Sequence, residues 1–407
     1  MILTAAPCFS SQAALDSHYE GGAFMPLGGS SSVAKTLVAT IVRHGGSVFV
    51  RAPVSEILLD HSGRAAGVRS RGVDVKAKVA VISTAGFRNT FGSSDLAVDR
   101  AADVAAGRKR VLGRATRQPL VPEPMAAQQR SLLQRSKNST TLADGKEAPE
   151  EEQEDTVGGS IAMIYLFVGL NKSDEELGLS GQNVWRLKDF DHDAAFAAFE
   201  AMNATSSSNN GSATNGDIAS SNESGASPPS IPALEDLPAC FVGMASAKDR
   251  DWPRRHPGKA CVTVLAPVPY SWFAPWQNSS VKHRGAAYEA YKSQWKDLLL
   301  AALYEHWPQC RGCVEVAEVG TPLSHNFYLG TVRGEVYGLD ANVARFASLE
   351  AHLATHPGPC AYVPGLYQAG QDALCVGVPS ALLSGVFAAA RISPLAGGRA
   401  VLEALVS

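Results

Sequence analysis

Two long stretches with few large apolar side chains limit where this chain can build a core. Residues 107–158 run from a basic start into Gln-, Ser- and Glu-rich sequence, and residues 203–229 are almost wholly small and polar. Neither stretch can bury enough apolar surface to offset the entropy lost on ordering. We therefore predict two disordered insertions, with the folded structure formed by the sequence around them.

The sequence before the first insertion predicts a helix followed by strands. Glycines and serines open an amphipathic helix that carries Val33, Leu37 and Ile41 on one face and ends at Gly45 and Gly46. Residues 47–60 then alternate as a strand, a turn follows, and strand-like sequence continues to a run of small residues near position 85.

The sequence after the first insertion continues the mixed pattern. Residues 160–171 are an apolar strand-like run, residues 238–276 contain two more strands around a charged turn, and residues 284–308 predict a helix of about six turns that ends before Pro308. No internal repeat is present. We predict an α/β fold in the mixed, α+β sense.

Composition excludes several classes of function. The 407 residues are 45% hydrophobic with a formal net charge of −3, which allows a sizeable core and argues against nucleic acid as the main partner. Among seven cysteines only Cys310 and Cys313 form a CxxC. A metal site needs about four ligands, and neither a second pair nor a nearby His pair follows, so we predict free thiols and no metal.

Residues 365–391 contain a long hydrophobic run without charge. Eighteen uncharged residues separate Asp372 from Arg391, a length that could cross a membrane. Gly377, Pro379 and two serines dilute the run, however, and proline is favoured in the first turn of a helix. The pattern therefore predicts a buried strand that ends at Gly370, followed by a core helix that begins near Val378.

This order of residues suits a cofactor site as well as a plain loop. A helix N-terminus presents free N–H groups and a partial positive charge, which stabilise the electron-rich edge of a flavin. Glycines allow the backbone to approach a ring closely, and the Asp372 carboxylate could accept hydrogen bonds from ribityl hydroxyls. The alternative is that Asp372 only caps a loop beside an ordinary buried helix.

Several motifs carry a resemblance to one family, and it covers nearly the whole chain outside the two insertions. The sequence has PLGGSS at 26–31, SAKDRDWPRR at 246–255, GTPLSHNFYLGTVRGEVYGLD at 320–340 and GLYQAGQD at 365–372. These motifs, in this order, resemble the superfamily of FAD-dependent oxidoreductases that contains phytoene desaturases, carotenoid isomerases and retinol saturases. The second and third motifs favour the retinol saturase branch.

The resemblance implies an FAD-dependent enzyme that saturates a C=C bond of a retinoid- or carotenoid-like polyene, with NAD or NADP as a candidate electron source. It also implies a partial Rossmann-like FAD/NAD(P)-binding domain and a mixed-sheet substrate domain. Residues 1–106 would belong to both regions, 159–330 to the substrate domain and 331–407 to the C-terminal FAD-contacting segment. Because the substrate would be apolar, we expect peripheral membrane association, at the endoplasmic reticulum or a plastid.

The resemblance also assigns residues. Those expected to contact the cofactor are Gly28, Gly29, Val54, Ser83, Thr84, Ala85, Gly370, Asp372, Gly377 and Val378. The catalytic acid is expected to be Tyr328 or His325. The candidates for lining a tunnel around the polyene are the aromatic residues Tyr270, Trp272, Phe273, Trp276, Phe327, Tyr328 and Tyr337.

One departure from the family pattern bears on activity. Members begin with a strand–GxGxxG–helix unit that holds the pyrophosphate of the dinucleotide, and this sequence contains no GxGxxG. Met1 aligns downstream of that unit, so we expect an N-terminally truncated chain that lacks the first βαβ unit and the targeting segment. A carotenoid cis/trans isomerase and an inactive remnant remain alternative functions. The charged turn at 246–255 is expected to be salt-linked rather than a nicotinamide phosphate site.

Overall fold

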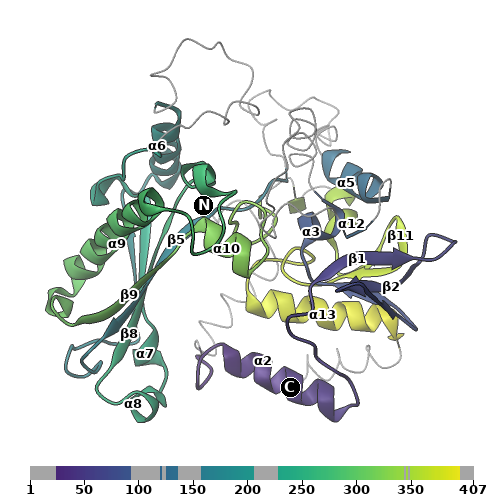
Figure 1. The fold of residues 1–407 in the computed structure, drawn as a ribbon, viewed down its shortest axis with the longest axis horizontal. Helices are drawn as coiled ribbons and strands as arrows, with labels where there is room; N and C mark the ends of the chain where they lie inside the picture. Colours follow the sequence, from purple (N-terminus) through teal and green to yellow (C-terminus); the bar gives the residue numbers. More distant parts are fainter. Residues whose placement is uncertain are drawn as a thin grey trace. The chain divides into compact units, whose positions relative to one another are not determined.

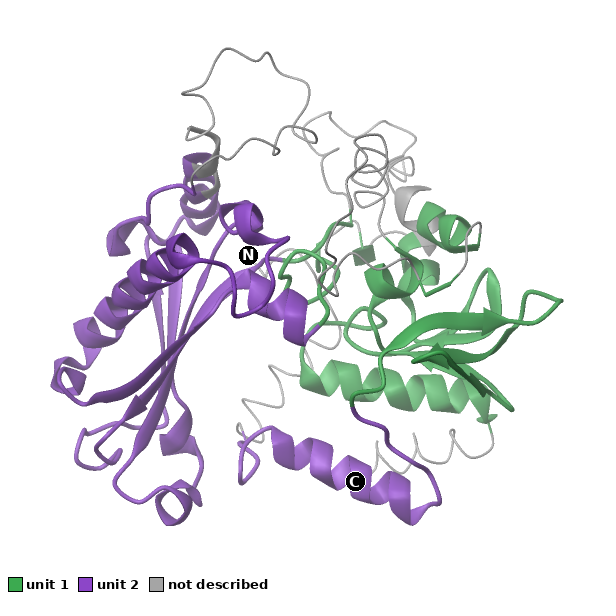
Figure 2. Ribbon diagram, in the orientation of Figure 1, with its two compact units in different colours: residues 1–22, 51–160, 330–407 green, residues 23–50, 161–329 purple. Residues whose placement is uncertain are grey.

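The computed structural model describes residues 24–92, 120–121, 125–135, 157–205, 228–342, 345–346 and 349–394. The chain divides into two compact units, shown in different colours in Figure 2. Unit 1 contains residues 1–22, 51–160 and 330–407, and unit 2 contains residues 23–50 and 161–329. Both units mix helices and strands, as the sequence predicted.

Unit 2 is built around one antiparallel sheet (Figure 1). Within the described residues its strand order is β6–β7–β8–β5–β9. The strands are β5 (Met163–Leu170), β6 (Asn183–Leu187), β7 (Ala239–Met244), β8 (Ala260–Pro267) and β9 (Val314–Gly320). The predicted strand at 160–171 and the pair around the charged turn are confirmed.

The two faces of this sheet differ sharply. On one face Val242, Val264, Leu166 and Val319 lie side by side on adjacent strands and are at most 5% exposed. Helix α9 (Ala286–His306) packs on this face, and its Trp295, Leu299 and Leu303 belong to the same core cluster. The predicted long helix is therefore confirmed, and it covers the sheet on one side, as Figure 1 shows.

Some of the aromatic residues that we predicted to line a substrate tunnel lie inside this core. Three of them are at most 9% exposed: Trp272 in the short helix η5 (Tyr270–Trp272), Phe273 directly after it, and Trp276 in η6 (Ala274–Trp276). Phe273 packs edge-on against Tyr291 of α9 at 5.4 Å between ring centroids, and Trp276 packs in the same way against Tyr288, also at 5.4 Å. The tunnel prediction is wrong for these three residues, because the chain after β8 folds back beneath α9.

The other helices of unit 2 are short, except α2 and α6. Helix α2 (Ser31–Arg43) confirms the predicted amphipathic helix, and every one of its residues is at least partly exposed. The remaining helices are α6 (His192–Thr205), η4 (Leu234–Asp236), α7 (Ala245–Lys248), α8 (Trp252–Arg255), η7 (Pro308–Cys310) and α10 (Pro322–Tyr328). None of the described helices of the chain is long and apolar enough to cross a membrane.

Unit 1 contains two small sheets. Within the described residues, one is the antiparallel meander β1 (Val54–Leu59), β2 (Ala65–Ser70) and β3 (Val73–Lys76). The other has the order β10–β11–β4, with β4 (Val81–Ser83), β10 (Gly358–Cys360) and β11 (Val363–Gln368). The helices of its described part are α3 (Phe87–Phe91), α5 (Met125–Arg135), α12 (Leu349–Thr355) and α13 (Val378–Ile392).

Two predictions for unit 1 need correction. The strand expected over 47–60 begins only at Val54, directly after Pro53, which has no N–H to donate to a strand partner. The disorder predicted over 107–158 is wrong for α5, whose Ala126 and Gln129 are buried. The Gln129 side chain donates a hydrogen bond to the Ala354 carbonyl of α12, so a polar residue supplies part of this packing. Most of the rest of that stretch, and residues 206–227 of the second, lie outside the described residues.

The contrast between the two sheet faces can be tested with neighbours on β5. Leu166 is fully buried and Phe167 is 48% exposed. We expect Leu166→Ala to lower the free energy of unfolding by about 2–5 kcal/mol, because it leaves a cavity in the core. Phe167→Ala removes a larger side chain and should nevertheless cost clearly less. Chemical denaturation of both variants measures this, and an equal loss would contradict the described faces.

Candidate functional site

The candidate cofactor site lies where two parallel strands end in unit 1. Strands β4 and β11 run parallel, with Ser83 opposite Gln368, and the Ala369 N–H donates to the Ser83 carbonyl at 3.0 Å. Ligands of α/β proteins commonly bind beyond the carboxyl ends of parallel strands. Here those ends lead into Thr84 and Ala85, both exposed, and into the Gly370–Asp372 segment.

The Asp372 carboxylate is buried between two loops of unit 1. Its Oδ2 accepts the Phe87 N–H at 2.7 Å, and its Oδ1 accepts the Leu339 N–H at 2.8 Å. The residue is 5% exposed. Two backbone amides thus compensate a charge that would otherwise be costly to bury.

Glycines and one arginine complete this arrangement. Gly86 and Gly338 have positive φ, and a Cβ at either position would overlap an oxygen of Asp372. The buried Arg345 guanidinium donates to the carbonyls of Gln371 at 2.9 Å and Asp372 at 2.7 Å, and to that of Leu339 at 3.2 Å. The segments around Leu339 and Asp372 are therefore linked twice. The Asp372 carboxylate accepts the Leu339 N–H, and Arg345 donates to carbonyls of both segments.

Helix α13 begins six residues after Asp372, at Val378. Gly370 and Gly377 have φ of 101° and 98°, and a Cβ at either would meet nothing closer than 3.9 Å. Pro379 stands in the first turn, and Val378 is 63% exposed. Ser384 accepts the Gly370 N–H at 2.7 Å and so fixes the helix to the end of β11. The predicted start near Val378 is therefore confirmed, but the prediction of a core helix is wrong, because only Ser380, Ser384 and Ala388 of α13 are buried.

The other predicted cofactor residues fall into three places. The Ser83 hydroxyl is buried and bonds the Thr90 hydroxyl at 2.7 Å. Val54 is the first residue of β1 in the separate meander of unit 1. Gly28 and Gly29, with φ of 82° each, form the turn before α2 in unit 2. The structure thus brings the predicted residues Ser83 to Ala85 and Gly370 together at one edge of a sheet, and α13 is attached there through Ser384.

The open face of the unit 2 sheet is an apolar surface that sequence analysis missed. Trp185, Phe241, Leu265 and Tyr165 are successive cross-strand partners on β6, β7, β8 and β5, so their side chains share one face. The rings of Trp185 and Phe241 lie 4.9 Å apart, and Trp185 is 59% exposed. The near-continuous apolar sequence of β5 hides the alternation that would have revealed this second face.

The predicted catalytic acids lie in unit 2, in or beside this surface. His325 and Tyr328 are in α10, whose N-terminus carries a capping box of Thr321 and Ser324. The His325 ring packs on Tyr165 at 4.9 Å between centroids, at the end of the apolar row. Tyr328 is 68% exposed and packs edge-on against Phe327. The geometry therefore connects His325, rather than Tyr328, with the apolar face.

The cysteine pair offers no metal site. Cys310 and Cys313 are both buried, in the same core as α9, and burial raises the pKa of the Cys310 thiol to about 11. In the parts of the chain that the structure describes, no group of three His, Cys, Asp or Glu residues could hold a metal ion.

Comparison with known proteins supports the family resemblance. The chain is 30% identical over 378 residues to all-trans-retinol 13,14-reductase from Rattus norvegicus, and 30% identical over 383 residues to the enzyme of the same name from Macaca fascicularis. Each comparison covers 92% of this chain and 50% of the relative, so the chain spans about half the length of these curated relatives. No protein-family model matches the chain.

A further relative carries the name of an inactive protein. The protein named "Inactive all-trans-retinol 13,14-reductase" from Danio rerio is 24% identical over 379 residues. The chain is thus similar over 92% of its length to proteins named as reductases and to one named as inactive. Its motifs and its similarity to these curated relatives support the retinol saturase family.

The Asp372 arrangement predicts a specific loss of stability. In Asp372→Asn an amide group replaces one carboxylate oxygen, so either the Phe87 or the Leu339 N–H loses its acceptor. We expect the free energy of unfolding to fall by about 1–3 kcal/mol, the cost of a buried unsatisfied donor. The exposed Asp74→Asn, which breaks a surface ion pair with Arg69, serves as the control and should change stability little. Equal effects of both variants in thermal denaturation would contradict the arrangement.

The buried thiols give a second test. We expect Cys310 and Cys313 to resist alkylation by iodoacetamide at neutral pH until the chain unfolds, because both are buried and the raised pKa of Cys310 suppresses its thiolate. Cys261, which is only half-buried, is the internal control and should react first. Peptide mass spectrometry measures the order, and early labelling of the pair would overturn this description.

Proposed function

We propose that this chain carries half of an FAD site and belongs to an oxidoreductase that saturates a C=C bond of a retinoid-like polyene. The observation that carries the proposal is the start of α13 at the carboxyl end of the parallel pair β4 and β11. A helix N-terminus beside such strand ends favours an electron-rich ligand edge. The names of the relatives supply the substrate class.

The residues at this edge suit a flavin. Gly370 and Gly377 leave open space where a side chain would stand, so backbone and ring can approach closely. The exposed Val378 and the first amides of α13 would meet the pyrimidine edge of the ring, and Thr84 and Ala85 would contact the dinucleotide. When bound, reduced FAD supplies the hydride for the reduction. The Asp372 carboxylate accepts two amides of this chain and would meet the ribityl chain through its remaining acceptor positions.

The apolar face of the unit 2 sheet suits the substrate. A polyene is long, flat and uncharged, and the row from Trp185 to Tyr165 offers it aromatic and aliphatic contact without a buried charge. His325, packed on Tyr165, would donate the proton that the second carbon of the double bond requires. NAD or NADP would supply electrons to the flavin, and association with a membrane surface would give access to the substrate.

Two alternatives remain for experiment. A cis/trans isomerase of carotenoids would use the same apolar face without changing the mass of its substrate. An inactive chain is the other, and the inactive Danio rerio relative shows that such proteins occur near this family. The length shared with the relatives is only about half of theirs, so the activity of the whole protein is part of the proposal.

The function is tested with the 407-residue chain, FAD, a chemical reductant and all-trans-retinol under anaerobic conditions. We expect flavin to bind, as seen in its visible absorption, and the product to gain two hydrogens by mass spectrometry. Isomerised product of unchanged mass would favour the isomerase, and absence of flavin binding by the folded chain would refute the proposal for this chain.

A variant series tests the proton donor. His325→Ala should lower turnover about 10²–10⁴-fold, the usual contribution of a general acid, with little change in flavin binding. Tyr328→Phe should retain most activity. The exposed His283→Ala is the matched control. The assignment fails if Tyr328→Phe, and not His325→Ala, abolishes reduction.

A further inference from the structure

One glycine of the unit 2 sheet lies beneath an aromatic ring. A Cβ placed on Gly243 would lie 2.8 Å from Cε1 and 3.1 Å from Cζ of Phe241, the residue two positions earlier on β7. Residues two positions apart on a strand share a face, so the Phe241 ring lies along the open face of the sheet, over Gly243. Any other residue at position 243 would force this ring to move.

The backbone alone does not call for glycine at this position. Gly243 is not among the described glycines with positive φ, and it pairs in register with Asn183 of β6 and Thr263 of β8. Glycine in the interior of a strand weakens it, and often marks a place where a ligand or another group approaches closely. The ring of Phe241 is therefore the contact that explains glycine here.

Neighbouring side chains leave the Phe241 ring few other places. Trp185, its partner on β6, packs edge-on against it at 4.9 Å between ring centroids. The Oδ1 of Asn183, which accepts a hydrogen bond from Lys248 Nζ, lies 3.3 Å from the Cβ position on Gly243. A side chain at position 243 would therefore drive the ring away from the sheet or against Trp185.

The Phe241 ring belongs to the apolar row of the open face. The four residues of this row are direct cross-strand partners on adjacent strands: Trp185, Phe241, Leu265 and Tyr165. The row therefore runs straight across the sheet over three strand spacings, about 14 Å in all. None of the four side chains is charged. A straight, uncharged row of this length suits an extended apolar chain better than a bent one.

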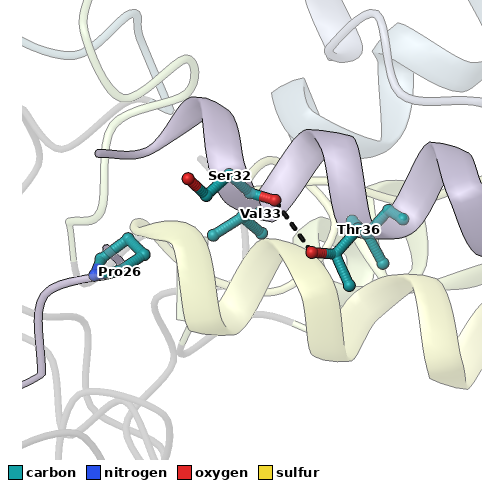
Figure 3. A pocket seen from close by; sticks show the side chains of 5 residues that line it. Pro26, Ser32, Val33 and Thr36 are labelled. Carbon is teal, nitrogen blue, oxygen red and sulfur yellow. Dashed lines mark hydrogen bonds between the residues drawn. The ribbon is translucent and has the colours of Figure 1, made fainter. Parts of the chain in front are cut away.

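The open face is distinct from the hollow in unit 2 that Figure 3 shows. That hollow has a volume of about 290 Å³, and none of its lining residues belongs to the sheet: Pro26, Ser32, Val33, Thr36 and Leu37. A ligand on the open face would lie along the side chains of the row, so the position of each ring decides how much contact the ligand makes.

We propose that Gly243 is a positioning residue that sets the shape of the substrate: it holds the Phe241 ring over the strand, so that the row accepts a straight polyene in preference to a bent one. The inference rests on the proposed function, because the polyene on this face is part of it. Gly243 acts through the Phe241 ring, which makes the contact.

Binding of two retinol isomers to the 407-residue chain tests the inference, with retinol fluorescence as the signal. The parent chain should prefer all-trans-retinol to the bent isomer 9-cis-retinol. We expect Gly243→Ala to bind all-trans-retinol about tenfold more weakly, because the row loses one aromatic contact, and to bind 9-cis-retinol as the parent does. The preference between the isomers should therefore fall about tenfold.

Gly169→Ala is the matched control. Gly169 lies on the same face of β5, and a Cβ there would meet the Val316 side chain at 3.5 Å, an ordinary contact. This variant should keep the parent's affinity for both isomers, since no ring has to move.

Two further variants show whether the ring transmits the effect. Phe241→Ala should also lose the preference for all-trans-retinol, and adding Gly243→Ala to it should change little, because no ring remains to be displaced. Thermal denaturation shows that each variant is folded. If folded Gly243→Ala and Phe241→Ala keep the parent's preference, or if the parent binds both isomers equally, the inference is wrong while the proposed function stands. If the folded parent chain binds neither isomer, the proposed substrate site itself fails and the inference falls with it.

Discussion

The Asp372 carboxylate is the interaction on which the candidate cofactor edge of unit 1 depends. Phe87 and Leu339 each give it one backbone N–H, so three segments far apart in the sequence meet at one side chain. A buried carboxylate without such partners would be costly, and glycine at positions 86 and 338 is what lets the backbone come close enough. The ends of β4 and β11 and the start of α13 therefore have fixed places because a charge had to be satisfied.

Unit 2 is organised by a different constraint. Its sheet has one face that α9 covers and one face that remains partly open, and both are apolar. An antiparallel sheet with a solvated face normally carries polar side chains there. A row such as Trp185, Phe241 and Tyr165 on the open side therefore calls for an explanation beyond folding, and exposed apolar surfaces of this kind commonly mark ligand or partner sites. The flat hydrocarbon substrate that we propose would account for this surface.

Sequence reasoning reached the elements whose signals are local. The helix at α2, the apolar strand at β5 and the Gly–Pro start of α13 carry their own caps and periodicity, and all three were confirmed. It failed where tertiary contacts decide the outcome. Helix α5 is ordered by packing on α12, and Trp272 became core because the chain turns beneath α9. Arg345 carries no motif that would reveal its bonds to distant carbonyls.

Two aspartates of the family motifs have the same kind of surroundings in the structure. Asp372 was expected at a ribityl chain, and Asp249 was expected in a surface turn, yet each is a buried carboxylate that holds the backbone of a distant glycine-containing loop. An ionised carboxylate has about four acceptor positions, and the amides recorded for Asp372 occupy two of them. Its ability to meet a ligand therefore depends on exposure rather than on remaining acceptors. The physical reason to retain an aspartate at both motifs is the same: only a short carboxylate can reach and fix a backbone amide there while its charge is compensated.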